Sequence, residues 1–214
     1  NKMHIAFRVH SVVGISRISW EAIQKPDKAL TNGEDGVATG IAQCGDNLVT
    51  ILDFEKIVAE IAPETSIQVS DIDKLGERIQ RDQSIILAED SILLTKMISD
   101  SLFRAGYSNL TTFNNGKEAW EFLESIRGED DFYKRAALLI TDIEMPEMDG
   151  HRLTKLVKED EKMRNMPVVI FSSLINEEMR IKGKQLGADE QLSKPEIGRL
   201  VEVMDALLDR RERK

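Results

Sequence analysis

The second part of the chain alternates short apolar runs with amphipathic stretches. Five apolar runs of strand length recur after residue 83, at 85–88, 110–113, 136–141, 168–171 and 191–192. Each is followed by a stretch with apolar residues at helical spacing, at 91–105, 117–127, 151–162, 177–186 and 196–209. This pattern predicts a parallel sheet covered by helices on both faces, because parallel crossovers need connections of helix length.

The first part, residues 1–65, has the pattern of strands and turns. Three stretches have the apolar or β-branched composition of strands, at 3–13, 37–43 and 48–52. The pair Gly45-Asp46 predicts a hairpin turn between the last two. Asp53 stands at an N-cap position ahead of residues 54–61, whose apolar residues recur at helical spacing. We therefore predict a β-rich segment that is followed by a short helix.

A polar connector joins the two parts. Residues 66–83 carry only a weak helical pattern, formed by Ile72, Leu75 and Ile79. The sequence thus predicts a β-rich domain or part-domain over 1–65, a linker over 66–83 and an α/β domain over 84–214.

Composition and charge narrow the function classes. A net charge of −9 argues against binding the phosphate backbone of nucleic acids. The longest apolar runs are of strand length, far below the roughly 20 residues of a membrane helix, so we expect no membrane insertion. The single cysteine, Cys44, excludes an internal disulfide, and without a secretory leader we expect a cytoplasmic location. Because the chain starts at Asn1, we also expect it to be a piece of a longer protein.

Polar residues follow the predicted strands of the α/β domain. Glu89 and Asp90 follow the first strand, Asp142 the third, Ser172 the fourth and Lys194 the fifth. Ligands of open parallel sheets bind beyond the carboxyl ends of the strands. We therefore expect three carboxylates, a hydroxyl and an ammonium to meet at one edge of the sheet.

Three carboxylates at one place favour a bound cation. Like charges repel one another unless a cation lies among them, and Mg²⁺ prefers oxygen ligands and keeps several waters. An aspartate beside Mg²⁺ is chemically suited to attack a phosphoryl group and form an acyl phosphate. Ser172 and Lys194 would then bind the phosphoryl oxygens, and Lys suits this role as a mobile point charge.

The motifs of residues 84–214 resemble a response-regulator receiver domain along its whole length. They are Ala88-Glu89-Asp90-Ser91, Thr141-Asp142-Ile143-Glu144-Met145-Pro146, Met148-Asp149-Gly150, Ser172-Ser173, Gly187-Ala188-Asp189 and Ser193-Lys194-Pro195. The resemblance implies a flavodoxin-like (βα)5 fold with strand order 2-1-3-4-5.

The same resemblance implies roles for individual residues. Asp142 would be the phosphoacceptor of a histidine kinase, and Ser172 and Lys194 would contact the phosphoryl group. Glu89, Asp90, Asp142 and the backbone carbonyl of Glu144 would hold Mg²⁺.

Two positions depart from the receiver pattern. Gln191 stands three residues before Lys194, where the family usually has an aromatic residue whose rotamer reports phosphorylation. Glu144 lies beside the expected metal, where it could obstruct or position an attacking water. We therefore expect a lifetime of the acyl phosphate that differs from that of other receivers and is either longer or shorter.

Residues 1–65 resemble the later half of a CheW-like coupling domain. The matching stretches are 5–12, 15–18, 37–40 and 48–57. Such domains are small β-barrels that dock onto histidine kinases and chemoreceptor tips. A coupling domain followed by a receiver is similar to CheV-type chemotaxis coupling proteins, and the resemblance covers this chain without the first half of the coupling domain.

Three functions follow from these observations. The first is a chemotaxis adaptor that couples chemoreceptors to a CheA-type histidine kinase and is regulated by Mg²⁺-dependent phosphorylation of Asp142. Such a receiver catalyses at most its own phosphorylation and dephosphorylation. The second is a Mg²⁺-dependent phosphatase or phosphotransferase that works through an aspartyl phosphate; Glu144 stands where one such enzyme type has a second aspartate. The third, a DNA-binding response regulator, is disfavoured by the acidic charge and by the lack of a helix-turn-helix segment after the receiver.

Overall fold

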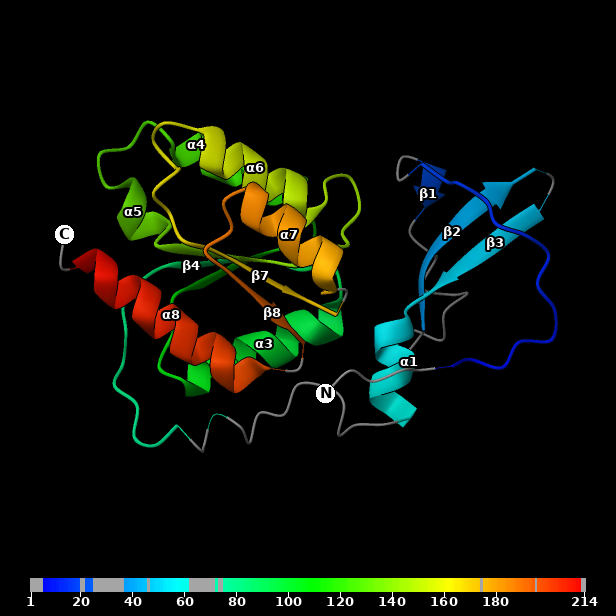
Figure 1. The fold of residues 1–214 in the computed structure, drawn as a ribbon, viewed down its shortest axis with the longest axis horizontal. Coiled ribbons are helices and arrows are strands. Elements are labelled where there is room, and N and C mark those ends of the chain that lie inside the picture. The colour runs from blue at the N-terminus through cyan, green and yellow to red at the C-terminus, as the bar shows by residue number, and fades with distance from the viewer. Residues whose placement is uncertain are drawn as a thin grey trace. The chain divides into compact units, whose positions relative to one another are not determined.

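The computed structural model divides the chain into two compact units, residues 1–52 and 53–214 (Figure 1). The structure describes residues 6–19, 22–24, 37–45, 47–61, 72, 75–173, 175–194 and 196–212. No helix in these described ranges is both long and apolar enough to cross a membrane.

The first unit contains a three-stranded antiparallel sheet. Its strands are β1 (Ile23–Gln24), β2 (Ala38–Cys44) and β3 (Asn47–Leu52), in the order β1-β2-β3. Cys44 pairs with Asn47, which leaves a two-residue loop between β2 and β3. The predicted hairpin is therefore confirmed, although Asp46 of its turn lies outside the described residues.

The strand predicted over residues 3–13 was wrong for the part that is described. Residues 6–13 form neither a strand nor a helix, and residues 3–5 lie outside the described residues. The side chains of Val12 and Val13 are 80% and 102% exposed. Apolar β-branched residues favour a strand, but a strand forms only when a neighbouring strand pairs its backbone N–H and C=O groups. The strand pairs of the first unit join β1, β2 and β3, and none of them includes residues 6–13.

The second unit begins with α1 and contains a five-stranded parallel sheet. Helix α1 (Phe54–Ile61) starts directly after Asp53, as the N-cap pattern predicted. The strands are β4 (Ile85–Ala88), β5 (Leu110–Phe113), β6 (Leu138–Thr141), β7 (Val168–Ser172) and β8 (Glu190–Ser193). All pair in parallel in the order β5-β4-β6-β7-β8, which confirms the flavodoxin-like order 2-1-3-4-5.

Helices cover both faces of this sheet (Figure 1). They are α3 (Ile92–Arg104), α4 (Gly116–Ile126), α5 (Phe132–Arg135), α6 (Gly150–Glu159), α7 (Glu177–Gln185) and α8 (Ile197–Glu212). One apolar cluster packs the sheet against α3 and α8, and a second packs it against α4 and α6. The one-turn helix α5 was not predicted, because four residues are too few to show a period; its buried Phe132 anchors it in the second cluster.

The central strands are apolar throughout because both faces of the sheet are covered. Every residue of β4, β6 and β7 is buried. Along β4, Ile85 and Leu87 point into the first cluster, while Ile86 and Ala88 point into the second. Successive side chains of a strand point to opposite faces, so a strand covered twice must be apolar at every position. This sheet fixes the strand ends that carry the polar residues.

The described part of the connector packs on the second unit. Ile72 is 2% exposed within the cluster beneath α3 and α8, and Leu75 packs against the same cluster. Arg81 then forms a single parallel bridge with Tyr107, just ahead of β5.

Candidate functional site

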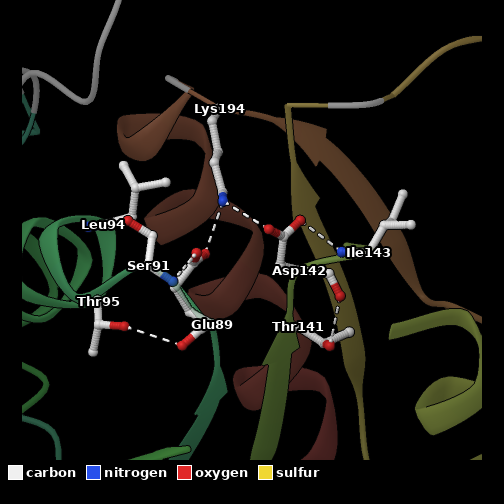
Figure 2. A network of polar contacts seen from close by, with 8 residues as sticks. All are labelled: Glu89, Ser91, Leu94, Thr95, Thr141, Asp142, Ile143 and Lys194. Atoms are coloured by element: carbon white, nitrogen blue, oxygen red, sulfur yellow. Dashed lines mark hydrogen bonds and ion pairs between the residues drawn. The ribbon is translucent and has the colours of Figure 1, made fainter. Parts of the chain in front are cut away.

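The candidate site lies at the carboxyl ends of four strands. Glu89 follows β4, Asp142 follows β6, Ser172 ends β7 and Lys194 follows β8. Because the strands are parallel, their carboxyl ends share one edge of the sheet. Figure 2 shows Lys194 reaching between the carboxylates of Glu89 and Asp142.

The ammonium of Lys194 bridges two buried carboxylates. Its Nζ lies 2.8 Å from Oε2 of Glu89 and 3.1 Å from Oδ2 of Asp142. The side chains of Lys194, Glu89 and Asp142 are only 5%, 1% and 5% exposed. Removing one partner of a buried ion pair leaves an uncompensated buried charge. The two carboxylates therefore need a cation, and Lys194 is the cation that the structure shows between them.

The carboxylate of Asp142 is held in one orientation. Its Oδ1 accepts a hydrogen bond from the backbone N–H of Ile143 at 2.6 Å, while Oδ2 faces Lys194. Helix α6 starts against the Asp142 backbone, and a Cβ on Gly150 would overlap the Asp142 carbonyl oxygen. Only glycine allows this close approach. The glycine that begins α6 thus helps to fix the position of the aspartate.

Glu89 is oriented by the start of α3. The backbone N–H of Ser91 donates to Oε1 of Glu89 at 3.2 Å, and the hydroxyl of Thr95 donates to the Glu89 carbonyl at 3.3 Å (Figure 2). The Ser91 hydroxyl in turn accepts from the N–H of Leu94 and caps the helix. We did not predict this role of Ser91 from the sequence. A serine directly before an amphipathic stretch is an N-cap signal that could have revealed it.

The residues present fit a hard divalent cation. Glu89, Asp90 and Asp142 each offer a carboxylate oxygen, and these oxygens lie within 4.8 Å of one another. Carboxylate oxygens are the ligands that Mg²⁺ prefers, and it needs only one or two of them beside its waters. The backbone carbonyl of Glu144 as a further ligand stays a prediction; the Glu144 side chain is exposed.

Ser172 lies at the end of β7, beside Lys194. It is 1% exposed and pairs with Ser193 in the register of β7 and β8. Its carbonyl oxygen accepts from the backbone N–H of Lys194 at 3.3 Å. The structure thus brings together the backbones of Ser172 and Lys194, the two residues expected to contact the phosphoryl group.

Gln191 fastens β8 to α7. Its Nε2 donates to the Arg180 carbonyl at 2.8 Å, and Arg180 Nη1 donates to the Gln191 carbonyl at 3.1 Å. Gln191 is 7% exposed and lies over Gly183, where an added Cβ would overlap its side chain. At the position where receivers usually carry an aromatic ring, this chain has an amide that is hydrogen-bonded to the neighbouring helix.

Comparison with protein families finds two matches. Residues 85–205 match the response regulator receiver domain, and residues 1–62 match the CheW-like domain.

Comparison with individual proteins finds chemotaxis proteins that are similar to almost the whole chain. The chemotaxis protein CheV2 of Helicobacter pylori is 29% identical over 209 residues, which cover 95% of this chain and 64% of CheV2. CheV3 of the same organism is 26% identical over 215 residues, covering 98% of this chain and 68% of CheV3. The chain therefore spans about two thirds of the length of these relatives.

A solved structure agrees with the fold of the second unit. The receiver domain of a signal transduction histidine kinase from Syntrophus aciditrophicus is 28% identical to this chain, with a TM-score of 0.53. The match covers 62% of this chain and 94% of that receiver domain.

Proposed function

This chain belongs to the response regulator receiver domain family and carries a CheW-like segment ahead of the receiver, and on that basis we propose that it is a chemotaxis signalling adaptor controlled by phosphorylation of Asp142. In this proposal residues 1–65 form part of the coupling domain, 66–83 the connector and 84–214 the receiver. The chain acts on itself at most and turns over no other substrate.

One observation carries the proposal. The Asp142 carboxylate lies beside two further carboxylates and is bridged by Lys194 at 3.1 Å. This arrangement presents one oriented nucleophile next to a metal-binding set and a mobile cation. Phosphoryl transfer requires positioning and charge neutralisation more than any other contribution from a protein.

Each residue of the site has its own role in the proposed phosphoryl transfer. One oxygen of the Asp142 carboxylate attacks the phosphorus of a phosphohistidine. The new O–P bond forms as the P–N bond breaks, and the released imidazole takes up one proton from water. Lys194 moves from Glu89 to a phosphoryl oxygen, and the Ser172 hydroxyl donates to another. Glu89, Asp90, Asp142 and the Glu144 carbonyl would hold Mg²⁺, which would supply positive charge to the incoming phosphoryl oxygens.

The partners follow from the two domains. A CheA-type histidine kinase supplies the phosphoryl group, and the CheW-like segment couples to the array of chemoreceptors and kinase. For both interactions the chain must lie in the same compartment as the kinase, which is the cytoplasm in this proposal. The similarity to CheV2 and CheV3 supports this assignment, over the two thirds of their length that the chain spans.

A labelling experiment tests the proposal. The chain is incubated with acetyl phosphate and Mg²⁺, so that the Asp142 oxygen displaces acetate and no proton is needed. We expect about one hydroxylamine-labile phosphate per chain and its loss in Asp142→Asn, since an amide is not a comparable nucleophile.

A matched control removes a different carboxylate of the same loop. Asp149 caps α6 by accepting from the N–H of Arg152. Asn caps helices as well as Asp, so Asp149→Asn should keep both the fold and the label. A label that survives in Asp142→Asn would contradict the assignment. Release of many phosphates per chain from a phosphorylated substrate would favour the alternative, a Mg²⁺-dependent phosphatase or phosphotransferase.

A further inference from the structure

The connector ends in a segment that is held against the receiver. We call residues 75–83 the strap. The backbone N–H of Arg81 donates to the Gly106 carbonyl at 2.9 Å, and Arg81 forms a parallel bridge with Tyr107. Together with the buried Ile72, these contacts attach the strap to the receiver unit.

Two arginines of the strap bind two aspartates of α8. Arg78 makes a bidentate pair with Asp205, at 2.9 Å from Nη2 to Oδ1 and 2.8 Å from Nη1 to Oδ2. Arg81 lies 2.8 Å from Asp209 by its Nη1 and 3.3 Å from Asp205 by its Nε. The Tyr107 hydroxyl also donates to Asp205, at 2.6 Å. A bidentate arginine pair is geometrically specific, so this network fixes where the strap lies on α8.

Partial burial makes the network stronger than a surface ion pair. The side chains of Arg78, Arg81 and Asp205 are between 15% and 19% exposed. Burial alone would raise the pKa of Asp205, but the hydrogen bonds from Arg78 and Tyr107 outweigh it and lower that pKa. The hydrogen bond to Asp205 raises the pKa of Arg78. Both groups therefore stay charged at neutral pH, and the strap is held by charge as well as by its apolar anchor.

Arg78 contacts two different helices at once. Its Nε donates to the carbonyl of Ala105, at the C-terminal end of α3, at 3.2 Å. Its other two nitrogens bind Asp205 of α8. The guanidinium is planar and rigid, so it keeps all three bonds only while α3 and α8 keep their relative position.

These two helices both begin at the candidate site. Helix α3 starts behind Glu89 and Asp90, and its cap residue Ser91 donates to the Glu89 carboxylate. Helix α8 starts three residues after Lys194, which bridges Glu89 and Asp142. The ion pair between Lys194 and Glu89 therefore joins the starts of the helices, and Arg78 joins α8 to the end of α3.

We propose that the strap is a clasp that loosens when Asp142 is phosphorylated. The proposal rests on the proposed function and adds the route by which the receiver acts on the connector. Once Lys194 leaves Glu89 for a phosphoryl oxygen, the two helix starts lose their shared ion pair and shift. Arg78 then cannot hold Ala105 and Asp205 together, and the connector gains length and freedom ahead of the receiver.

Amide hydrogen exchange of residues 75–83 tests the clasp. The full chain is measured with Mg²⁺ alone and with Mg²⁺ and acetyl phosphate, and phosphate incorporation is measured on the same samples. We expect exchange of the Arg81 amide to become about tenfold faster on phosphorylation. In the phosphorylated chain the ion pairs of the strap are already loosened, so local opening of the strap costs less free energy. Asp142→Asn should remove this difference.

Variants of α8 separate the clasp from the chemistry. Asp205→Asn should give fast strap exchange in both states with unchanged phosphate incorporation. Asp209→Asn loses one ion pair of a more exposed carboxylate, so it should increase the exchange rate of the strap by less. This variant keeps the test usable if Asp205→Asn folds poorly. Glu202→Gln, an exposed change on the same helix, should behave like the unchanged chain.

The outcomes distinguish the two proposals. Full phosphate incorporation with unchanged strap exchange would overturn the clasp and leave the proposed function standing. Absence of incorporation would overturn both. The clasp would be supported if the strap exchanges fast in the phosphorylated chain and equally fast in Asp205→Asn without phosphate.

Discussion

The two sheets of the chain differ in where their apolar side chains lie. In the receiver sheet, every residue of β4, β6 and β7 is buried between two layers of helices. In the first unit, Leu48 and Leu52 of β3 are 77% and 41% exposed. Both sheets contain strongly apolar strands, so apolar content alone does not bury a strand. The covered sheet can hold charges at fixed distances along its edge, and this allows the receiver to carry the candidate site.

The largest effect should follow from removing the buried cation of the receiver. Lys194→Ala leaves the carboxylates of Glu89 and Asp142 without their shared ammonium. We expect the free energy of unfolding of the receiver to fall by roughly 3–5 kcal/mol in the absence of divalent cations. Urea denaturation measures this change.

Magnesium should partly restore the stability of this variant. Added Mg²⁺ should stabilise Lys194→Ala more than the unchanged chain, because it supplies the missing positive charge. An equal Mg²⁺ effect on both proteins would mean that the cation does not bind among these carboxylates.

We also expect Lys194→Ala to accept phosphate from acetyl phosphate without changing coupling to a kinase. A phosphate-dependent change of kinase activity equal to that of the unchanged chain would contradict this.

A pair of leucine substitutions compares the two sheets directly. Leu139 of β6 is 0% exposed and Leu48 of β3 is 77% exposed. Leu139→Ala should cost about 2–5 kcal/mol of unfolding free energy through lost burial and the cavity it leaves. Leu48→Ala should change stability by less than about 0.5 kcal/mol. Similar losses in denaturant titrations of the two variants would refute the contrast between a covered and an exposed sheet.

A pair of glycine substitutions tests the packing beneath Gln191. A Cβ on Gly183 would overlap the Gln191 side chain, whereas no atom lies within 4 Å of a Cβ on Gly14 in the first unit. Gly183→Ala should displace the amide from α7 and cost about 1–3 kcal/mol. Gly14→Ala serves as the control, with no measurable loss expected in thermal unfolding. A neutral Gly183→Ala would show that α7 and β8 separate without strain.

The smallest effect concerns the pH dependence of stability. His151 of α6 is 2% exposed. Burial, followed by the charge of Lys182, lowers the pKa of His151, against the smaller effects of Asp149 and a backbone hydrogen bond to Met179. A lowered folded-state pKa means that the unfolded chain binds the proton more readily. The contribution of neutral His151 to the free energy of unfolding is therefore complete above the unfolded-state pKa of about 6.5. This contribution is lost as the pH decreases below that value.

Histidine substitutions isolate this contribution. His151→Gln should flatten the loss of stability between neutral and mildly acidic pH, measured by denaturation at a series of pH values. A slope that persists in His151→Gln would assign the effect to other groups.

The sequence predicted the parts of the fold that have a local period. The strands at 85–88 and 110–113 and the start of α1 were predicted to the residue, because apolar runs and an N-cap are local signals. The strand expected over 3–13 failed for its described part, since pairing depends on residues far away in the chain. Helix α5 was missed because a single turn has no period.

The candidate site was predictable in its residues but not in its contacts. The carboxylates and Lys194 followed from their places at strand ends. The backbone N–H groups that orient Asp142 and Glu89, from Ile143 and Ser91, depend on local backbone geometry that no residue type specifies. Two ion pairs of the strap, Arg78–Asp205 and Arg81–Asp209, join residues that lie 127 and 128 positions apart, and no pattern along the chain indicates such a pair.

In the function that we propose, Asp142 receives a phosphoryl group with the help of magnesium held by the neighbouring carboxylates. Peptide mapping of the phosphate bound after treatment with acetyl phosphate, measured over a range of Mg²⁺ concentrations, tests it most directly. We expect one modified residue, Asp142, with incorporation that rises with Mg²⁺ and disappears when a chelator removes it. Phosphate on a different residue, or equal incorporation with and without the chelator, would refute the proposed role of Asp142.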